Sequence, residues 1–208
     1  MASHISIVPL KKEHVAACAD TFIKCFEQEA FFKNAFDLRS TNAKERMKKS
    51  IYSRLIMYLA LKQPIFVALD QNNVVGFSMS SVNPAPLNIR VAPLESFKMV
   101  YNFLFVLRYV HFKKVYPLLK LGKKSKHIHE PYLFLEAIGV IPEYRGKGIA
   151  KSLINETISY CSSKTECKGT YLFTGDYLNR NIYSKYGFEV VEERENSIFK
   201  AFHMFNKV

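Results

Sequence analysis

The stretch YLFLEAIGVIPEYRGKGIAKSLINETISYCSS, residues 132–163, decides how the rest of the chain is interpreted. Its first ten residues, 132–141, are almost continuously apolar and β-prone, which predicts a central strand buried on both faces. From Ile149 onward the apolar side chains recur at helical spacing, with polar side chains on the other side. Between the two lies the segment from Pro142 to Gly148, so the chain leaves a strand, turns tightly and enters a helix through two glycines.

This strand-to-helix turn is suited to binding an anion. The first N–H groups of a helix have no partner inside it, and the helix dipole places partial positive charge at the same point. Gly146 and Gly148 lack the Cβ atoms that would hold a phosphate away from the backbone, and Arg145 and Lys147 add full charges. We therefore expect a pyrophosphate here. The spacing fits neither a Walker A loop nor G-x-G-x-x-G, which argues against nucleotide kinases and Rossmann enzymes.

The turn resembles the acetyl-CoA site of the GNAT superfamily of N-acetyltransferases, whose signature is [QR]-x-x-G-x-[GA]. The matching residues are Arg145, Gly146, Lys147, Gly148, Ile149 and Ala150. The resemblance implies an α/β (α+β) fold with a mixed central sheet flanked by helices, and acetyl-CoA as acetyl donor. It also implies that Ile138 and Val140 pair with the pantetheine arm through their backbone, where their strand splays from its neighbour. The alternative is an ordinary surface turn with glycines at its bends.

Two residues are candidates for proton transfer. Glu136 interrupts an apolar strand, where an ionised carboxylate is costly unless it is paired or used. It is either the base that deprotonates the amine or a structural carboxylate, paired to a buried Arg or Lys or facing a wet cleft. Tyr183 begins a stretch that resembles the Y-x-x-x-G-F motif of the family, which implies a general acid for the departing sulfur. The alternative is a plain core aromatic. Asn179 resembles the asparagine that contacts the cofactor, and Asn181 competes for that role.

The remaining pattern predicts a single domain over residues 1–208. We expect strands at 5–10, 64–70, 74–82, 169–174, 188–192 and 197–205, and helices at 13–26, 43–61 and 177–186. Gly187 is placed to end the last of these helices in a left-handed conformation. A helical, lysine-rich insertion at about 94–128 exceeds a minimal GNAT member, and Pro117 is expected to end or kink its helical pattern.

The four cysteines, Cys18, Cys25, Cys161 and Cys167, show no C-x-x-C spacing. We expect free thiols, a reducing cytoplasmic setting and no acyl-cysteine intermediate. No histidine cluster specifies a metal, so we expect none. No apolar stretch is long enough to span a bilayer, and we expect no membrane partner.

The net charge of +12 fits a CoA ligand with its phosphates, but it does not decide the function alone. Residues 97–129 hold eight Lys and Arg residues and no carboxylate, interleaved with aromatic residues that could stack on bases. We favour a helix that uses these aromatics for core contact and its lysines for solvation, and expect no nucleic-acid partner.

We therefore expect a monomeric or homodimeric enzyme that transfers an acetyl group from acetyl-CoA to a primary amine of a small molecule or peptide. The amine attacks directly in a ternary complex. The alternatives are a non-catalytic CoA-binding protein of the same fold and a basic nucleic-acid-binding module.

Overall fold

The computed structural model describes residues 5–27, 29–82, 92–196 and 199–208. Within these residues a seven-stranded sheet has the order β1-β2-β3-β4-β5-β7-β6. The strands are β1 (Ile5–Pro9), β2 (Ile65–Asp70), β3 (Asn73–Val82), β4 (Leu133–Val140), β5 (Gly169–Thr174), β6 (Glu189–Glu195) and β7 (Lys200–Lys207). The stretch quoted at the outset supplies β4, the middle strand of the sheet. The start of the last predicted strand, at residues 197–198, and Pro84 and Pro86 lie outside the described residues.

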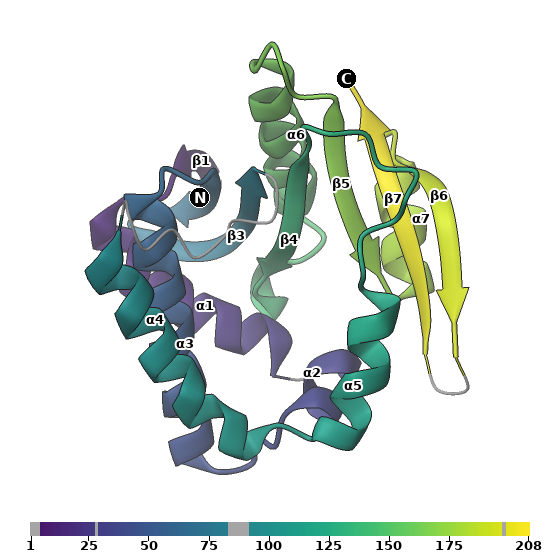
Figure 1. The fold of residues 1–208 in the computed structure, drawn as a ribbon. Helices are drawn as coiled ribbons and strands as arrows, with labels where there is room; N and C mark the ends of the chain where they lie inside the picture. Colours follow the sequence, from purple (N-terminus) through teal and green to yellow (C-terminus); the bar gives the residue numbers. More distant parts are fainter. Residues whose placement is uncertain (1–4, 28, 83–91, 197–198) are drawn as a thin grey trace.

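The sheet is mixed, as predicted. Neighbouring strands pair antiparallel except β4 and β5, which are parallel and pair only at Leu133 with Thr170 and Phe134 with Tyr171. Beyond Phe134 the two strands separate, and Figure 1 shows β5 diverging from β4. The splay that the resemblance implied is therefore present at the expected strand.

Helices cover both faces of the sheet (Figure 1). On one face, α1 (Val15–Phe26) and α3 (Thr41–Ala60) pack on a core that includes Val67 and Phe77. On the other, α6 (Ile149–Ser162) packs against Phe66 and Val75, and α7 (Tyr177–Ser184) lies over β5. Because successive strand residues point to opposite faces, Phe66 and Val67 enter different cores. A short helix, α2 (Ala30–Ala35), follows α1.

The predicted insertion forms two helices, α4 (Pro93–Val106) and α5 (Phe112–Leu121), joined by a 3-10 turn at Leu107–Tyr109. Pro117 was predicted to end or kink the helical pattern, and ending is wrong, because Pro117 lies inside α5 and the helix continues to Leu121. Figure 1 shows α4 beside α3 and α5 toward the β5–β7 side of the sheet. None of the helices in the described part of the chain is long and apolar enough to cross a bilayer.

Both ends of α5 are fixed to the domain. Before it, His111 N–H donates to the Ala35 carbonyl at 2.8 Å, and Asp37 N–H donates to the Tyr109 carbonyl at 2.8 Å. After it, the buried His203 of β7 donates from Nε2 to the Leu121 carbonyl at 2.8 Å. A carbonyl only accepts, so Nδ1 of His203 is the acceptor for the Tyr171 hydroxyl at 2.6 Å.

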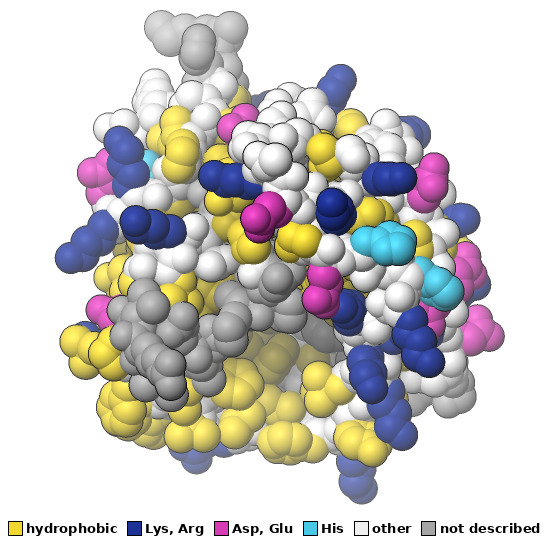
Figure 2. All heavy atoms as spheres, turned by 45° about the horizontal axis from the view of Figure 1, so that its top comes forward, with side chains coloured by type: hydrophobic (Ala, Val, Ile, Leu, Met, Phe, Trp, Pro, Cys, Tyr) yellow, Lys and Arg dark blue, Asp and Glu magenta, His cyan; other side chains and the backbone are white. Residues whose placement is uncertain are grey.

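Two expectations about the surface and the cysteines are wrong. Cys161 and Cys167 form a disulfide between the end of α6 and the start of β5, so only Cys18 and Cys25 are free thiols. Only two of the four cysteines therefore support the expectation of a reducing compartment. The aromatic side chains of the insertion do not all serve core contact, because Phe97 is 68% exposed and Tyr116 is 63% exposed. Figure 2 shows hydrophobic side chains along the lower edge of one face of the molecule.

Candidate functional site

The splay between β4 and β5 leaves part of the backbone of β4 without a strand partner on one side. Ile141 N–H donates to the Val75 carbonyl of β3 at 3.0 Å. Because backbone groups along a strand alternate in direction, Gly139 and Ala137 also point toward β3, whereas Ile138 and Val140 point toward the β5 side. The latter two are the residues that the sequence assigned to the pantetheine arm.

The chain leaves β4 through a 3-10 turn, Pro142–Tyr144, and enters α6 through the glycine loop. Gly146 and Gly148 have φ of 76° and 78°, in the left-handed region that side chains disfavour. A Cβ added to either would meet no atom within 4 Å, so the space in front of both glycines is open. Conformation therefore requires both glycines, and the open space leaves room for a ligand.

The start of α6 presents free donors to this space. Ser152 N–H donates to the Gly148 carbonyl at 3.1 Å, but in the described part of the chain the N–H groups of Ile149, Ala150 and Lys151 have no acceptor. Gly148 is the N-cap residue and offers no side-chain oxygen to satisfy them. An anion bound here would supply the missing acceptor.

The loop is fixed by contacts on either side of its cationic residues. Arg145 donates from Nε to the Val140 carbonyl at 3.1 Å, which leaves the terminal nitrogens of its exposed guanidinium available. Tyr144 donates its hydroxyl to Asp70 of β2 at 2.6 Å, and the Lys147 ammonium lies 4.4 Å from the centre of the Tyr144 ring. The hydrogen bond to Asp70 raises the pKa of Tyr144. These contacts hold the cationic side chains of Arg145 and Lys147 in place on the loop.

Glu136 lies at a β-bulge. Met79 pairs with Ala137 and Ser80 with Leu135, so Glu136 has no partner in the β3–β4 register. Its side chain is only 8% exposed and points to the face covered by α3. Tyr58 donates to its carboxylate at 2.8 Å, and Arg54 and Ser81 are the other two donors.

The Glu136 cluster joins α3 to the two central strands. Arg54 and Tyr58 lie one turn apart on α3 and therefore share a face, and Arg54 also donates to the Tyr58 hydroxyl at 3.1 Å. Burial raises the pKa of Tyr58 to about 12, with the Arg54 charge opposing and the Glu136 charge adding to the shift. Tyr58 is therefore a neutral donor at physiological pH. The Arg54 side chain stays 40% exposed, so one side of the cluster borders solvent.

Tyr183 of α7 packs on the face of the sheet that carries α6. Its ring lies 5.7 Å from the Phe188 ring, in a cluster that also holds Ile138 and Ile154. Its hydroxyl has no hydrogen-bond partner in the described chain, and burial raises its pKa to about 12. The phenol is therefore protonated at neutral pH and able to donate. It shares a cluster with Ile138, one of the two residues whose backbone faces the splay.

The two asparagine candidates are both exposed, but they differ in direction. Asn179 lies one helical turn before Tyr183 and so shares its face of α7, whereas Asn181 lies about 160° around the helix from Asn179. Asp176 is the N-cap residue of α7, and its carboxylate accepts from the N–H groups of Leu178 and Asn179. Helical geometry therefore favours Asn179 as the cofactor contact.

The free cysteines are poor nucleophiles. Burial raises the pKa of Cys18 to about 12 and that of Cys25 to about 11. Cys25 also packs tightly on β4, because a Cβ added to Gly139 would lie 2.9 Å from it. A thiol that remains protonated is a weak attacking group.

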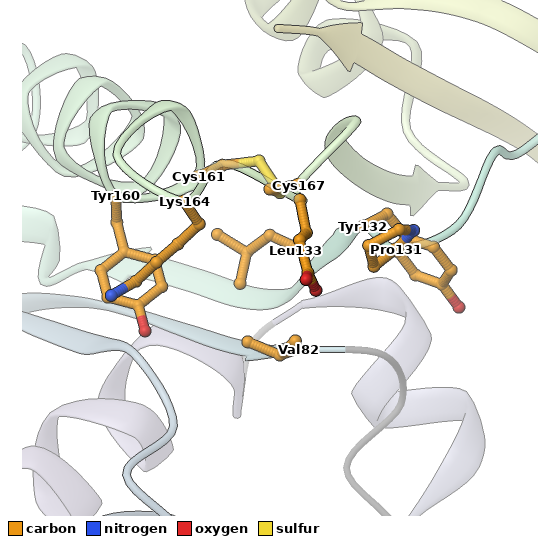
Figure 3. A pocket seen from close by; sticks show the side chains of 9 residues that line it. Val82, Pro131, Tyr132, Leu133, Tyr160, Cys161, Lys164 and Cys167 are labelled. Carbon is orange, nitrogen blue, oxygen red and sulfur yellow. A yellow bond between two sulfur atoms is a disulfide. The ribbon is translucent and has the colours of Figure 1, made fainter.

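A pocket of about 220 Å³ opens at the other end of β4, beside the disulfide. Figure 3 shows Tyr160 and Lys164 on one side of it and Pro131 and Tyr132 on the other. No residue predicted to bind acetyl-CoA or to transfer a proton lines it. The candidate site for the chemistry argued above is therefore the splay and the glycine loop, and not this pocket.

The sequence did not identify every residue around the candidate site. Arg54, Tyr58 and Ser81 hold Glu136, and Asp70 holds Tyr144, yet none of these was singled out. The pair Arg54 and Tyr58, at i and i+4 of a predicted helix, was the one local signal available. That spacing did not show which strand the Arg54 and Tyr58 side chains would contact.

Comparisons with known proteins identify the family of the chain. A family model described as "Acetyltransferase (GNAT) family" matches residues 28–188. The chain is 44% identical over 43 residues to "Histone acetyltransferase MCC1" of Arabidopsis thaliana, a match covering 21% of this chain and 17% of that protein.

Two solved structures share the fold along nearly the whole chain. The C-terminal condensation domain of Ebony in complex with β-alanyl-dopamine has a TM-score of 0.70 at 11% identity, with 99% of both chains covered. The PaiA N-acetyltransferase of Thermoplasma acidophilum in complex with coenzyme A has a TM-score of 0.59 at 15% identity, also with 99% of both covered. At such identities the likeness shows the fold alone. The family model, which matches most of the chain's length, places the chain in the GNAT acetyltransferase family.

Proposed function

We propose that this protein transfers an acetyl group from acetyl-CoA to a primary amine of a small molecule or peptide, by direct attack in a ternary complex. The observation that carries the proposal is the open glycine loop at the start of α6, with its unpartnered N–H groups, directly after the splayed end of β4. The loop suits a pyrophosphate, and the free side of β4 suits the amide groups of a pantetheine arm.

The binding residues have distinct roles in this proposal. Arg145, Gly146, Lys147, Gly148, Ile149 and Ala150 hold the pyrophosphate, with backbone N–H groups and two cationic side chains. Ile138 and Val140 offer backbone groups to the pantetheine arm. Asn179 contacts the cofactor from α7. When bound, acetyl-CoA supplies the activated acyl group, and the chain supplies position and proton transfer.

Two protons must move during the reaction. The amine, with a pKa of about 10, must lose a proton, and the leaving thiolate, with a pKa near 8.5, must gain one. The amine nitrogen attacks the thioester carbonyl, the C–N bond forms and the C–S bond breaks. Tyr183 donates its proton to the sulfur. Glu136 receives the amine proton through a water, because both carboxylate oxygens already accept hydrogen bonds from the protein.

An acetyl-CoA-dependent screen over chemically diverse amines, read by free-thiol release, tests the function. Turnover with at least one amine supports the transferase. If calorimetry shows that acetyl-CoA binds while no amine in the panel is acetylated, the result supports the alternative of a non-catalytic CoA-binding protein. If acetyl-CoA does not bind, the proposed pyrophosphate site is wrong.

A further inference from the structure

The outer face of α4 is apolar although it faces solvent. Leu94, Phe97, Tyr101 and Leu104 recur at spacings of three and four, and their side chains are 56%, 68%, 51% and 57% exposed. The inner face packs on α3, where Ser96 and Val106 are buried and Asn102 donates to Ser53 at 2.7 Å. An exposed apolar stripe of this length on a folded protein commonly marks an interaction site. The outer face of α4 therefore suits a partner that takes apolar side chains.

Helix α5 carries a second apolar stripe. Phe112, Tyr116 and Leu119, at spacings of four and three, are 61%, 63% and 68% exposed. Lys113 and Lys120 flank the stripe, and the Lys120 ammonium lies 5.0 Å from the Tyr116 ring centre. We call the exposed apolar residues of the two helices, together with the lysines and the arginine between and beside them, the α4–α5 surface.

The charge of the α4–α5 surface is predominantly positive, and the one carboxylate on the two helices is Glu95 in the first turn of α4. Residues 97–129 contain no carboxylate, and among the described residues no ion pair engages any of the following: Lys98, Arg108, Lys113, Lys120, Lys123 and Lys126. Lys124 pairs with Glu130, which lies just outside this segment. A partner that covers the apolar side chains would therefore also meet unneutralised positive charge.

Three kinds of partner differ in how well they fit. A second copy would set like charges against each other across a two-fold axis. A nucleic acid would use the lysines and stack on the aromatic rings, but it would leave Leu94, Leu104 and Leu119 against a polar, charged surface. An anionic lipid surface takes both features, because its headgroups attract Lys and Arg while its acyl boundary accepts Phe, Tyr and Leu side chains.

We propose that the α4–α5 surface binds the surface of an anionic membrane, with both helices lying in the plane of the interface. Such binding needs no spanning helix, so it departs from the expectation of no membrane partner, which rested on the lack of a stretch that could span a bilayer. Figure 2 shows hydrophobic side chains along the lower edge of the molecule and Lys and Arg side chains toward the right end of that edge. The hydrogen bonds from His111 and His203 fix the two ends of α5, so the surface is presented by an ordered element.

The test is co-sedimentation of the full chain with vesicles of phosphatidylcholine alone or with one third phosphatidylserine, at low and high salt. We expect binding to the anionic vesicles that weakens with salt. The triple variant Lys113→Gln, Lys120→Gln, Lys123→Gln should lower partitioning about a hundredfold. Its matched control, Lys12→Gln, Lys168→Gln, Lys207→Gln, makes the same change in net charge at exposed sites elsewhere.

A second pair of variants separates apolar contact from charge. Phe97→Ser with Leu104→Ser should lower partitioning more than tenfold, whereas the exposed pair Leu178→Ser with Val208→Ser should not change it. Absence of binding to anionic vesicles, or equal loss in variants and controls, overturns the proposal. So does a dimer, in sedimentation velocity, that the Phe97 and Leu104 changes dissociate while vesicle binding persists. Binding to an oligonucleotide but not to vesicles would assign the surface to nucleic acid instead.

Discussion

The guanidinium of Arg54 on α3 donates to the carboxylate of Glu136 on β4, at the bulge where Glu136 has lost its strand partner. One ion pair thus ties the helix layer to the middle of the sheet, beside the place where β4 leaves β5. Glu136 is therefore a paired carboxylate. The pairing serves either a structural role or to hold the carboxylate in position to receive a proton.

Replacing Glu136 by Gln tests that choice. The amide keeps the shape but loses basicity, so kcat/KM should fall, and most at lower pH, where little free amine exists without assistance. A lower melting temperature is also expected, because Arg54 loses its charged partner. Arg54→Met is the companion variant. If Glu136→Gln lowers stability but leaves the pH profile of kcat/KM unchanged, the carboxylate is structural and another group or water is the base.

Reversing the charge of Arg145 should weaken acetyl-CoA binding. A carboxylate would face the pyrophosphate in place of a guanidinium, and charge-assisted hydrogen bonds contribute about 1.5–3 kcal/mol, or roughly tenfold to a hundredfold in affinity. Titration calorimetry on Arg145→Glu measures the loss. Lys164→Glu, just beyond the other end of α6, is the matched control and should bind normally. Unchanged affinity in Arg145→Glu would remove the proposed phosphate site.

Replacing Gly148 by Ala separates ligand contact from folding. The backbone cost of a side chain at φ of 78° is about 1–2 kcal/mol, and the new Cβ meets no protein atom but enters the proposed phosphate space. Gly187 has a similar φ of 80° and lies away from the loop, and the Cβ added in Gly187→Ala would lie 2.8 Å from the Asn206 side-chain nitrogen. We expect both variants to lose stability in urea unfolding and only Gly148→Ala to lose acetyl-CoA affinity as well. Equal affinities in the two would argue that the loop does not contact the cofactor.

Tyr183→Phe should lower turnover by about a hundredfold or more while nearly preserving CoA affinity, because the ring keeps its packing and only the proton donor is lost. Its pKa of about 12 is raised by burial, and an acid acts in its protonated form. Activity that depends on Tyr183 should therefore be lost only as the pH rises through about 12. Any decline in the turnover of the wild type below pH 11 should also be present in the variant. Tyr186→Phe serves as control. If Tyr183→Phe has normal turnover under conditions where the chemical step limits the rate, Tyr183 is a core aromatic and not the general acid.

The disulfide predicts a thiol count. In denaturant, the unreduced chain should react with two equivalents of a thiol reagent, from Cys18 and Cys25, and the reduced chain with four. Cys161→Ser with Cys167→Ser should lower the free energy of unfolding by about 2 kcal/mol for so short a loop, and a reductant should abolish the difference. Four reactive thiols before reduction would contradict the bond.

The sequence predicted what depends on local pattern. Residues 132–163 carry a strand, two left-handed glycines and an amphipathic helix in an order that leaves little freedom, so β4, the loop and α6 were predicted close to their observed limits. The left-handed Gly187 after α7 was predicted for the same reason, and its φ of 80° confirms it.

What the sequence did not predict depends on distant contacts. Arg54 meets Glu136 across 82 positions, and the bulge at Glu136 exists only in relation to β3. Cys161 and Cys167 come together because α6 ends beside the start of β5, which their spacing did not reveal. Pro117 was expected to end or kink the helical pattern, but α5 continues past it to Leu121, in a segment that distant residues contact at both ends.

The two residue pairs that join β4 to β5 have a consequence for how the domain responds to its ligand. The sheet consists of a four-stranded half and a three-stranded half, which share little of their hydrogen-bond ladder. A molecule seated in the splay would act as an additional strand that bridges the halves. Occupancy should then slow amide hydrogen exchange in both halves together, so that cofactor binding also stiffens the sheet.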